Sequence, residues 1–228
     1  MAEEKNNYDF IFLIPGREFS INFINSWTNT LVYLNENDYS FASVFNYAPI
    51  IQEVRNQMLV NPIATDNANT RLRNFRRPGK QLFDGGSSAT RIIFIDSDMV
   101  WRTEDMEKLL HTDLDIVCGA YFPESGEQTC ILGKDGIFID YSQIQEKQEI
   151  FEIMGAGMGF VSVKPEVLEK IGFPWFNTLY LEDESGGTQF IGEDSFFFFR
   201  AEQEGYKIHC DPTIILGHEK KKVIGAHA

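Results

Sequence analysis

The feature that most limits what this chain can fold into is a short apolar run that ends in two carboxylates. Residues Arg91–Ile95 read RIIFI and lead directly into Asp96-Ser97-Asp98. The run predicts a buried strand, and a buried parallel strand delivers its last residues to the sheet edge where α/β proteins bind ligands. Two carboxylates this close repel each other, and a divalent cation between them relieves the repulsion. We therefore expect Asp96 and Asp98 to bind Mg²⁺ or Mn²⁺; the alternative is a solvated turn with an Asp cap for the following helix.

Apolar runs of strand length alternate with segments of helical periodicity along the chain. Strands are expected over Tyr8–Ile14, Tyr39–Phe45, Asp115–Cys118, Phe160–Val163, Tyr206–Cys210 and Pro212–Leu216, with a hairpin or short strands over residues 131–151. Helices are expected over residues 21–34, 49–59, 103–110, 165–171 and 193–204, the first capped by Ser20 and the third by Thr103. This alternation predicts an α/β fold: a single domain over residues 1–228, with a mixed, mainly parallel sheet flanked by helices.

Two stretches lack such a pattern. Residues 1–7 are polar and are expected to form a disordered tail, and residues 61–88 are rich in Asn, Arg and Gly. A loop this long inside a domain is often a lid or a disordered segment, so we expect it to be mobile. Its basic side chains form either a solvated surface or a lid that closes over a diphosphate or recruits a phosphorylated acceptor. They are Arg71, Arg73, Arg76, Arg77 and Lys80.

The charge and the apolar content of the chain exclude several classes of partner. Among 228 residues, 20 are basic and 34 are acidic, so the net charge is −14 and neither nucleic acid as a substrate nor an anionic membrane surface is expected. No stretch approaches the roughly 18 to 20 apolar residues that span a bilayer, and the polar start shows no signal peptide. Cys118, Cys130 and Cys210 are too scattered for a disulfide framework or a zinc knuckle. We therefore expect a soluble, cytoplasmic protein.

Three further motifs carry candidate chemistry. Glu193 and Asp194 stand at the start of an expected helix, where they are N-terminal caps or, for one of them, a general base. His218 follows the last expected strand and is either structural or a further ligand for the metal. The glycine-rich run at 155–159 precedes a strand rather than a helix, so it lacks the context of a dinucleotide fingerprint. It suits a backbone that passes close to a bound sugar.

The order of these motifs resembles that of the GT-A fold glycosyltransferases, in particular the large family-2-like group. The resemblance rests on successive segments between residues 90 and 220. They are IIFIDSDMVW (92–101), DIVCGAYFP (115–123), GAGMGFVSVKPEVLEKIGFPWF (155–176), GEDSFFFFRAEQEGYKI (192–208) and the segment around His218. The N-terminal part adds a strand that ends at Pro15 and Arg17, and a helix in which Arg55-Asn56 matches an RN pair frequent in such enzymes.

The resemblance implies a Rossmann-like nucleotide-binding half, an acceptor half and a role for each acidic motif. Asp98 would bind Mn²⁺ or Mg²⁺ directly, with Asp96 on the metal or the ribose and His218 as a third protein ligand. The metal would offset the charge of the diphosphate that leaves from a nucleotide-diphospho sugar, in the first place a UDP-sugar. Asp194 would be the catalytic base, with Glu193 orienting hydroxyl groups.

The same resemblance implies a set of donor-binding residues. They are Pro15, Gly16 and Arg17 near the nucleoside, Ser97 between the two aspartates, Gly157 in the loop that lines the donor-sugar pocket, and Arg55 and Lys220 on the phosphates. Trp175 would either stack under an acceptor sugar or belong to the core.

The implied reaction is a single displacement, in which a deprotonated hydroxyl of a carbohydrate or another acceptor attacks the anomeric carbon and inverts it. Retaining GT-A enzymes share the metal motif, so inversion rests on Glu193 and Asp194 alone. The chain departs from the family pattern in two ways: Phe41–Tyr47 contains no acidic residue, and the C-terminal acceptor region is short. Two alternatives stay open. One is a nucleotidyltransferase acting on a sugar phosphate; such enzymes usually have a glycine-rich loop, which Pro15-Gly16-Arg17 matches only in part. The other is a non-catalytic sugar- or nucleotide-binding module.

Overall fold

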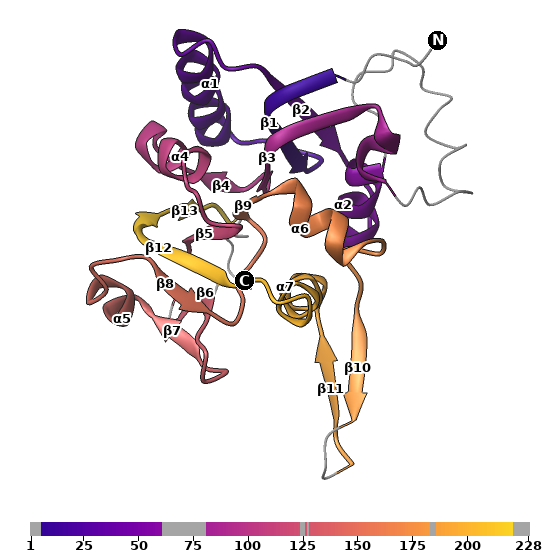
Figure 1. Ribbon diagram of the computed structural model, residues 1–228. Helices are drawn as coiled ribbons and strands as arrows, with labels where there is room; N and C mark the ends of the chain where they lie inside the picture. The colour runs from indigo at the N-terminus through magenta and orange to yellow at the C-terminus, as the bar shows by residue number, and fades with distance from the viewer. Residues whose placement is uncertain (1–5, 61–80, 124–125, 127, 183–185, 221–228) are drawn as a thin grey trace, which may run out of the picture.

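A seven-stranded sheet forms the centre of the protein (Figure 1). The structure, a computed structural model, describes residues 6–60, 81–123, 126, 128–182 and 186–220. Across the sheet the order is β2 (Phe41–Asn46), β1 (Asn6–Pro15), β3 (Ser87–Ile95), β9 (Phe160–Val163), β5 (Ile116–Ala120), β12 (Ile208–Ile215) and β8 (Phe151–Ile153). The helices are α1 (Ile21–Glu36), α2 (Ile51–Val60), the 3-10 helix η1 (Leu82–Gly85), α4 (Thr103–Leu110), α5 (Tyr141–Gln145), α6 (Pro165–Ile171) and α7 (Glu193–Gln203).

Most strands of this sheet share one direction. β1 pairs in parallel with β2 and β3, and β5 pairs in parallel with β12. β9 lies antiparallel between β3 and β5, and β8 lies antiparallel beside β12. The carboxyl ends of β1, β3, β5 and β12 therefore meet the amino end of β9 at one edge of the sheet. The expected α/β fold with a mixed, mainly parallel sheet is confirmed, and this edge collects residues that are far apart in the sequence.

Helices cover both faces of the sheet, because successive side chains of a buried strand point to opposite sides. Phe10, Phe12 and Ile14 of β1 belong to a core that includes α1 and α4. Ile11 and Leu13 belong to the core on the other face, with α2, α6 and α7. The alternation within β1 thus divides the hydrophobic core into two layers, with α1 and α4 at the upper left of Figure 1.

Three two-stranded ladders complete the described part of the chain. They pair β4 (Met99–Val100) with β13 (Gly217–His218), β6 (Gln128–Leu132) with β7 (Phe138–Asp140), and β10 (Leu179–Glu182) with β11 (Thr188–Ile191). The β4–β13 ladder lies just past the ends of β3 and β12, so it joins the two chain segments that leave the same sheet edge. The β10–β11 hairpin projects from the body of the molecule next to α7 (Figure 1).

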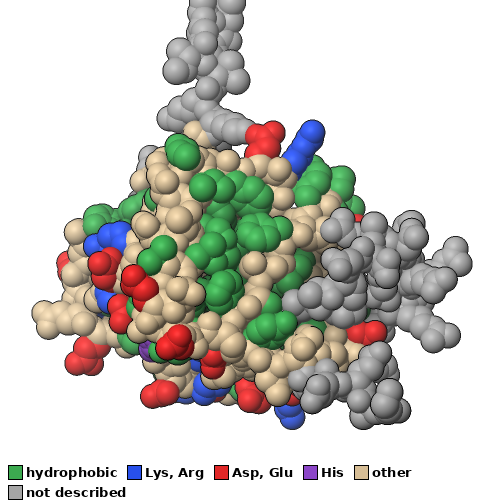
Figure 2. All heavy atoms as spheres, turned by 90° about the horizontal axis from the view of Figure 1, so that it is seen from above, with side chains coloured by type: hydrophobic (Ala, Val, Ile, Leu, Met, Phe, Trp, Pro, Cys, Tyr) green, Lys and Arg blue, Asp and Glu red, His purple; other side chains and the backbone are tan. Residues whose placement is uncertain are grey.

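The surface on the α1 side carries apolar side chains outside the core. Ile21, Ile24 and Val32 of α1 are exposed. Figure 2 looks down on this side of the molecule and shows apolar side chains at the centre of the face, with charged ones toward its margin. Even so, none of the helices in the described ranges combines the length and the apolar character that crossing a bilayer requires.

Several predicted boundaries move in the structure. The strand predicted from Arg91 begins at Ser87, within the segment expected to be a mobile loop, and residues 61–80 of that segment lie outside the described residues. Asn6 and Asn7, expected in a disordered tail, are the first residues of β1 and pair with β3. The two late strands are a single strand, β12, because a change of register after Cys210 lets the chain continue beside β5.

The helix starts are predicted with mixed success. Ser20 caps α1 as expected, since its Oγ accepts a hydrogen bond from the Phe23 N–H at 3.0 Å. The prediction that Thr103 caps α4 is wrong: Arg102 is the cap, and its N–H donates to Asp105 at 3.0 Å. Neither α5 nor the β10–β11 hairpin was predicted, because segments of four or five residues give weak periodicity.

A buried hydrogen-bond pair fastens α1 to the chain that follows the Asp96–Asp98 motif. The Ser26 hydroxyl donates to the Trp101 carbonyl at 2.8 Å and accepts from the Trp101 N–H at 3.1 Å. Ser26→Ala leaves both backbone groups buried without partners, so we expect a loss of about 1–3 kcal/mol in the free energy of unfolding. Urea unfolding measures it, with Ser142→Ala, on an exposed position of α5, as the control. Equal midpoints for the two variants would contradict the role of the pair.

Candidate active site

One edge of the sheet brings together most of the residues that the sequence singled out. Asp96 follows β3 directly, and its N–H donates to the Gly159 carbonyl at the start of β9 at 2.9 Å. Pro15 ends β1, the parallel neighbour of β3, and Gly16 follows it. Gly16 packs so closely on Ser97 that a Cβ at position 16 would collide with the Ser97 side chain. This contact holds the ends of β1 and β3 together.

Arg55 on α2 lies beneath this edge and bridges three carboxylates. Its Nη2 donates to Asp96 Oδ1 at 2.9 Å and Oδ2 at 3.1 Å. Its Nη1 donates to Glu193 Oε1 at 2.9 Å and Asp194 Oδ1 at 2.5 Å. The Arg55 side chain is only 2% exposed. A single buried guanidinium thus links the end of β3 to the start of α7, which lies more than 90 residues further along the chain.

The Arg55 guanidinium keeps its positive charge although it is buried. Burial would lower the pKa of the guanidinium, but Asp96, Asp194 and Glu193 raise it above its ordinary value. The resemblance implied that Arg55 binds nucleotide phosphates. The structure instead directs both ends of the guanidinium to carboxylates, so Arg55 positions the acidic side chains.

Asp194 has the properties of a group that takes up protons near neutral pH. Burial raises the pKa of its carboxyl group to about 6; the charge of Arg55 opposes this rise, while Glu193 and Asp96 add to it. Its Oδ2 also accepts a hydrogen bond from the Met158 N–H at 3.2 Å. The side chain remains 29% exposed. A carboxylate with this pKa is mostly ionised at pH 7 and is a stronger base than an ordinary aspartate.

The carboxylate of Asp98 contacts the imidazole of His218 and the ammonium group of Lys220. Its Oδ2 lies 3.1 Å from His218 Nε2 and accepts a hydrogen bond from Lys220 Nζ at 2.7 Å. Burial would raise the pKa of Asp98, but the hydrogen bonds with His218 and Lys220 lower it to about 2. The β4–β13 ladder, in which Met99 is paired with His218, places the imidazole beside the carboxylate.

The surroundings of His218 determine what can lie between it and Asp98. Nδ1 is 2.5 Å from the Phe122 carbonyl, which can only accept, so Nδ1 carries a proton. Nε2 then faces the carboxylate either with a second proton or with a lone pair. The hydrogen bond with Asp98 raises the pKa of His218, although burial acts in the opposite direction. Asp98 Oδ2 and Nε2 are therefore placed so that they could share a proton or a metal ion.

The expected three-ligand metal cluster is not formed by the side chains as they stand. Among the described residues, no three His, Cys, Asp or Glu side chains converge on a point that could hold a metal ion. Asp96 turns toward Arg55, so Asp98 and His218 remain as the pair that fits a divalent cation. A carboxylate oxygen and an imidazole whose other nitrogen donates to a backbone carbonyl are suitable metal ligands. Substrate phosphates and water commonly complete the coordination of Mg²⁺.

The glycine-rich run before β9 owes its composition to Tyr121. A Cβ at Gly157 would collide with the Tyr121 hydroxyl, which itself accepts from the Gly159 N–H at 3.3 Å. The Tyr121 ring packs edge-on against His218 with centroids 5.0 Å apart. The close backbone approach expected for a bound sugar is therefore required first by a side chain of the protein.

Two cavities open beside Asp96–Asp98. One, of about 270 Å³, is lined by Pro15, Gly16, Arg17, Tyr47, Ala48, Ile51, Val54, Asp96, Ser97 and Asp98. The other, of about 530 Å³, is lined by Arg17, Glu18, Phe19, Ser20, Ser97, Asp98, Glu219 and Lys220. Arg17 and Lys220 bring positive charge to this side of the cluster, and the Arg17 guanidinium carbon lies 6.0 Å from the centre of the exposed Tyr47 ring. Together the two linings include every predicted donor-binding residue except Arg55 and Gly157.

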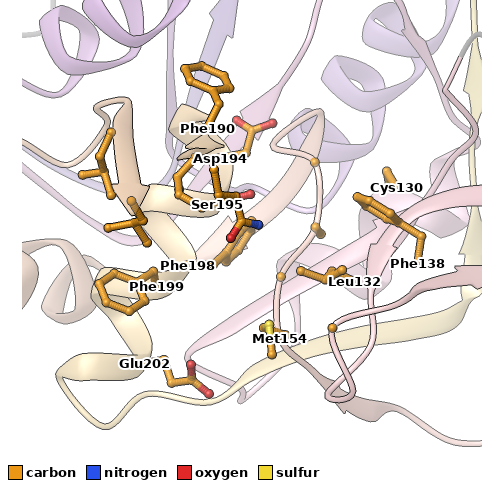
Figure 3. Close-up of a pocket in the computed structure, with 18 residues that line it drawn as sticks. Cys130, Leu132, Phe138, Met154, Phe190, Asp194, Ser195, Phe198, Phe199 and Glu202 are labelled. Atoms are coloured by element: carbon orange, nitrogen blue, oxygen red, sulfur yellow. The ribbon is translucent and has the colours of Figure 1, made fainter. Parts of the chain in front are cut away.

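A third cavity, of about 590 Å³, opens on the other side of the cluster and is reached by Asp194 and Gly157. Figure 3 shows Phe190, Ser195, Phe198 and Phe199 on one wall, with Leu132 and Phe138 on the opposite wall. Asp194 therefore lies between the Arg55 bridge and this cavity. Sequence reasoning missed the cavity, because its walls come from the hairpins and from the outward side of α7.

The structure also gives the positions of Trp175 and Lys220, two further residues with predicted roles. Trp175 is fully buried, and its indole N–H donates to the Leu168 carbonyl at 2.7 Å. Its proposed stacking under an acceptor sugar is therefore wrong, and it is a core residue. Lys220, predicted on the phosphates, binds Asp98 at the mouth of the donor-side cavity. The basic residues between 71 and 80 lie outside the described residues.

Comparison with solved structures finds proteins of similar fold. One is A197 from STIV, with a TM-score of 0.55 and 19% sequence identity over 93% of this chain and 86% of that one. Another is GalNAc-T7, solved with UDP, GalNAc and Mn²⁺, with a TM-score of 0.50 and 11% identity over 94% of this chain and 44% of that one. A third is the catalytic domain of Drosophila β1,4-galactosyltransferase 7 with xylobiose, with a TM-score of 0.46, 14% identity, and coverage of 95% and 71%.

The first two similarities, with TM-scores of 0.55 and 0.50, support the architecture. The protein has a GT-A-like fold, as the resemblance implied, with a seven-stranded mixed sheet flanked by helices. No protein-family model matches the sequence, and a comparison with curated proteins also finds no match. At identities below 20%, the similarity concerns the fold alone.

The bridging role of Arg55 predicts a stability defect that depends on pH. Arg55→Met leaves three neighbouring carboxylates without their cation, so we expect a loss of about 3–5 kcal/mol at pH 7. The charge of Arg55 opposes the rise in the pKa of Asp194, so without it that pKa rises further and the folded variant binds more protons. The defect should therefore shrink as the pH falls from 7 to 5. Chemical denaturation at both pH values measures it. Lys170→Met, which removes a surface pair with Glu204, is the control, and a defect independent of pH would exclude the bridge as its cause.

Proposed function

We propose that this protein is a glycosyltransferase that moves a sugar from a nucleotide-diphospho sugar, in the first place a UDP-sugar, to an acceptor hydroxyl. The observation that carries the proposal is the pairing of two acidic sites at one sheet edge. Asp98 and His218 form a cation-binding pair beside the cavities with positive charge. Asp194, with a pKa of about 6, opens onto the cavity on the other side. Leaving-group binding and proton removal thus have separate cavities at one sheet edge.

The donor would lie on the Asp98 side. Pro15, Gly16 and Tyr47 form the walls of the smaller cavity and suit a nucleoside, with the exposed Tyr47 ring available for stacking on the base. Arg17 and Lys220 offer positive charge to the diphosphate. Mn²⁺ or Mg²⁺ held by Asp98 and His218 would offset the charge that develops on the leaving diphosphate.

The acceptor would lie on the Asp194 side. Its hydroxyl proton passes to the Asp194 carboxylate while its oxygen forms a bond to the anomeric carbon. The bond from that carbon to the diphosphate oxygen breaks, and its electron pair leaves with the nucleoside diphosphate. Attack from the side opposite the leaving group inverts the anomeric carbon, which accords with a base separated from the diphosphate side.

Arg55 and Glu193 support this base without being free to react. The bridge from Arg55 fixes Asp194 Oδ1, and the Met158 N–H fixes Oδ2, so the carboxylate has a defined orientation. Glu193, at 2.9 Å from the same guanidinium nitrogen, adds negative charge that keeps the pKa of Asp194 raised.

The free thiols Cys118, Cys130 and Cys210 are consistent with the predicted cytoplasmic location.

Donor cleavage tests the proposal directly. Incubation with Mn²⁺ and a panel of nucleotide sugars should release nucleoside diphosphate. Calorimetry should show that Asp98→Asn weakens Mn²⁺-dependent nucleotide binding by at least about tenfold, because a metal ligand is lost. Asp113→Asn, on an exposed carboxylate away from the sheet edge, is the control. Pyrophosphate release from a sugar phosphate and a nucleoside triphosphate would instead indicate a nucleotidyltransferase, and the absence of both release and nucleotide binding would indicate a sugar-binding module.

The base assignment makes a separate prediction. Asp194→Asn should keep nucleotide affinity and lose about 10²–10⁴-fold in transfer rate. Since the pKa of Asp194 is about 6, the wild-type rate at low substrate should fall about tenfold between pH 7 and pH 5 as the carboxylate is protonated. A pH series of initial rates measures this. Full transfer activity in the Asn variant would rule out Asp194 as the base.

A further inference from the structure

The cavity on the Asp194 side has walls of unusual composition for a sugar-binding site. Most of its lining side chains are aliphatic or Phe, from the β6–β7 and β10–β11 hairpins, α7 and residues 154–157. They are Leu132, Phe138, Met154, Leu179, Leu181, Phe190, Ile191, Phe198 and Phe199. Figure 3 shows how the labelled members of this set face one another across the space. Its volume of about 590 Å³ is that of a small-molecule pocket.

Several of these side chains remain exposed although they are large and apolar. Leu181 is 47% exposed, Phe190 56% and Phe199 49%. They belong to two different elements, the β10–β11 hairpin and α7, and line the same cavity. A ligand with an apolar body would remove this surface from water, which is the main source of binding free energy for such a pocket.

The charges of the lining exclude one group of ligands. Among the described residues that line the cavity, the charged ones are Asp194 and Glu202, both carboxylates, and none is Lys, Arg or His. Lys134 pairs with Glu202 at 3.1 Å but does not line the cavity. An anionic acceptor, such as a lipid phosphate or a sugar phosphate, would meet two negative charges without a lining cation. An uncharged acceptor avoids this repulsion.

The polar side chains of the lining are few. Gln189, Ser195, Asp194 and Glu202 offer hydrogen-bonding groups, which is enough to orient a hydroxyl but few for the many hydroxyls of a free sugar. From these contacts we infer that the acceptor is an uncharged alcohol or glycoside with an alkyl or aryl body. Its hydroxyl lies at Asp194 and its apolar body lies between α7 and the β10–β11 hairpin. This inference rests on the proposed function for the identity of the reacting group.

Matched ligands that differ only in their apolar tail test the inference. Hexyl β-glucoside and methyl β-glucoside share one sugar, and both are used below the concentration at which micelles form. Each buried methylene contributes about fourfold in affinity, so a hexyl chain with half of its added methylenes buried should bind about 30-fold more tightly. Calorimetry measures both affinities without any need for catalysis. Equal affinities would overturn the inference, as would tighter binding of hexyl phosphate than of hexyl β-glucoside.

Two variants on different elements of the cavity lining and one control locate the binding. Leu181→Asn and Phe199→Asn should each remove most of the tail-dependent gain, whereas Ile21→Asn, on the exposed side of α1, should retain it. An equal loss in all three would show non-specific association of the alkyl chain and would overturn the assignment. Circular dichroism confirms that each variant is folded, and the exposed positions of all three side chains favour this.

Donor cleavage, measured in parallel, separates the two proposals. Release of nucleoside diphosphate without any dependence of binding on the tail would leave the proposed function standing and overturn the acceptor class. Tail-dependent binding that Leu181→Asn abolishes, without release from any donor, would leave the apolar pocket standing and overturn the glycosyltransferase function.

Discussion

The organisation of the site depends on the buried guanidinium of Arg55. It brings together Asp96, at the end of β3, and the Glu193–Asp194 pair, at the start of α7, and its positive charge offsets the repulsion among these carboxylates. Taking an arginine out of water costs several kcal/mol, which is recovered only when its donors are paired. With two nitrogens on three carboxylates, four side chains become one unit. Their geometry is therefore set by the fold before any substrate arrives.

The same bridge divides the acidic residues between two tasks. Asp96 and Asp98 are separated by one residue, yet Asp96 turns to Arg55 while Asp98 turns to His218 and Lys220. Their surroundings move the pKa of Asp98 down to about 2 and that of Asp194 up to about 6. Asp98 therefore keeps its charge and suits cation binding, whereas Asp194 exchanges protons near neutral pH. Carboxylates with pKa values pushed apart in this way are typical of sites that need one stable anion and one base.

The sequence predicted the elements of the site better than their contacts. The alternation of strand and helix patterns was enough to predict an α/β fold, because strand burial shows in local hydrophobic patterns. The GT-A-like fold was implied by the resemblance that the order of the motifs carries. The partners of Arg55 could not be predicted. Glu193 and Asp194 lie 138 and 139 positions after Arg55 in the sequence, and their contact with it depends on how α2 packs. The same holds for Trp175, an aromatic residue whose burial depends on neighbours from other elements. The β10–β11 hairpin was missed because its exposed apolar residues do not follow the alternation of a half-buried strand.

That hairpin also explains how the site could select an acceptor. A two-stranded hairpin is marginally stable by itself, and most apolar side chains of this one line the cavity rather than pack in the core. A ligand that fills the cavity would bury the hairpin and α7 against each other and stabilise both. Apolar walls alone discriminate only weakly, because each buried methylene changes the affinity by about fourfold. Discrimination against charged acceptors must therefore come from Asp194 and Glu202, so the residue that removes the proton also repels anions from the place where the reaction occurs.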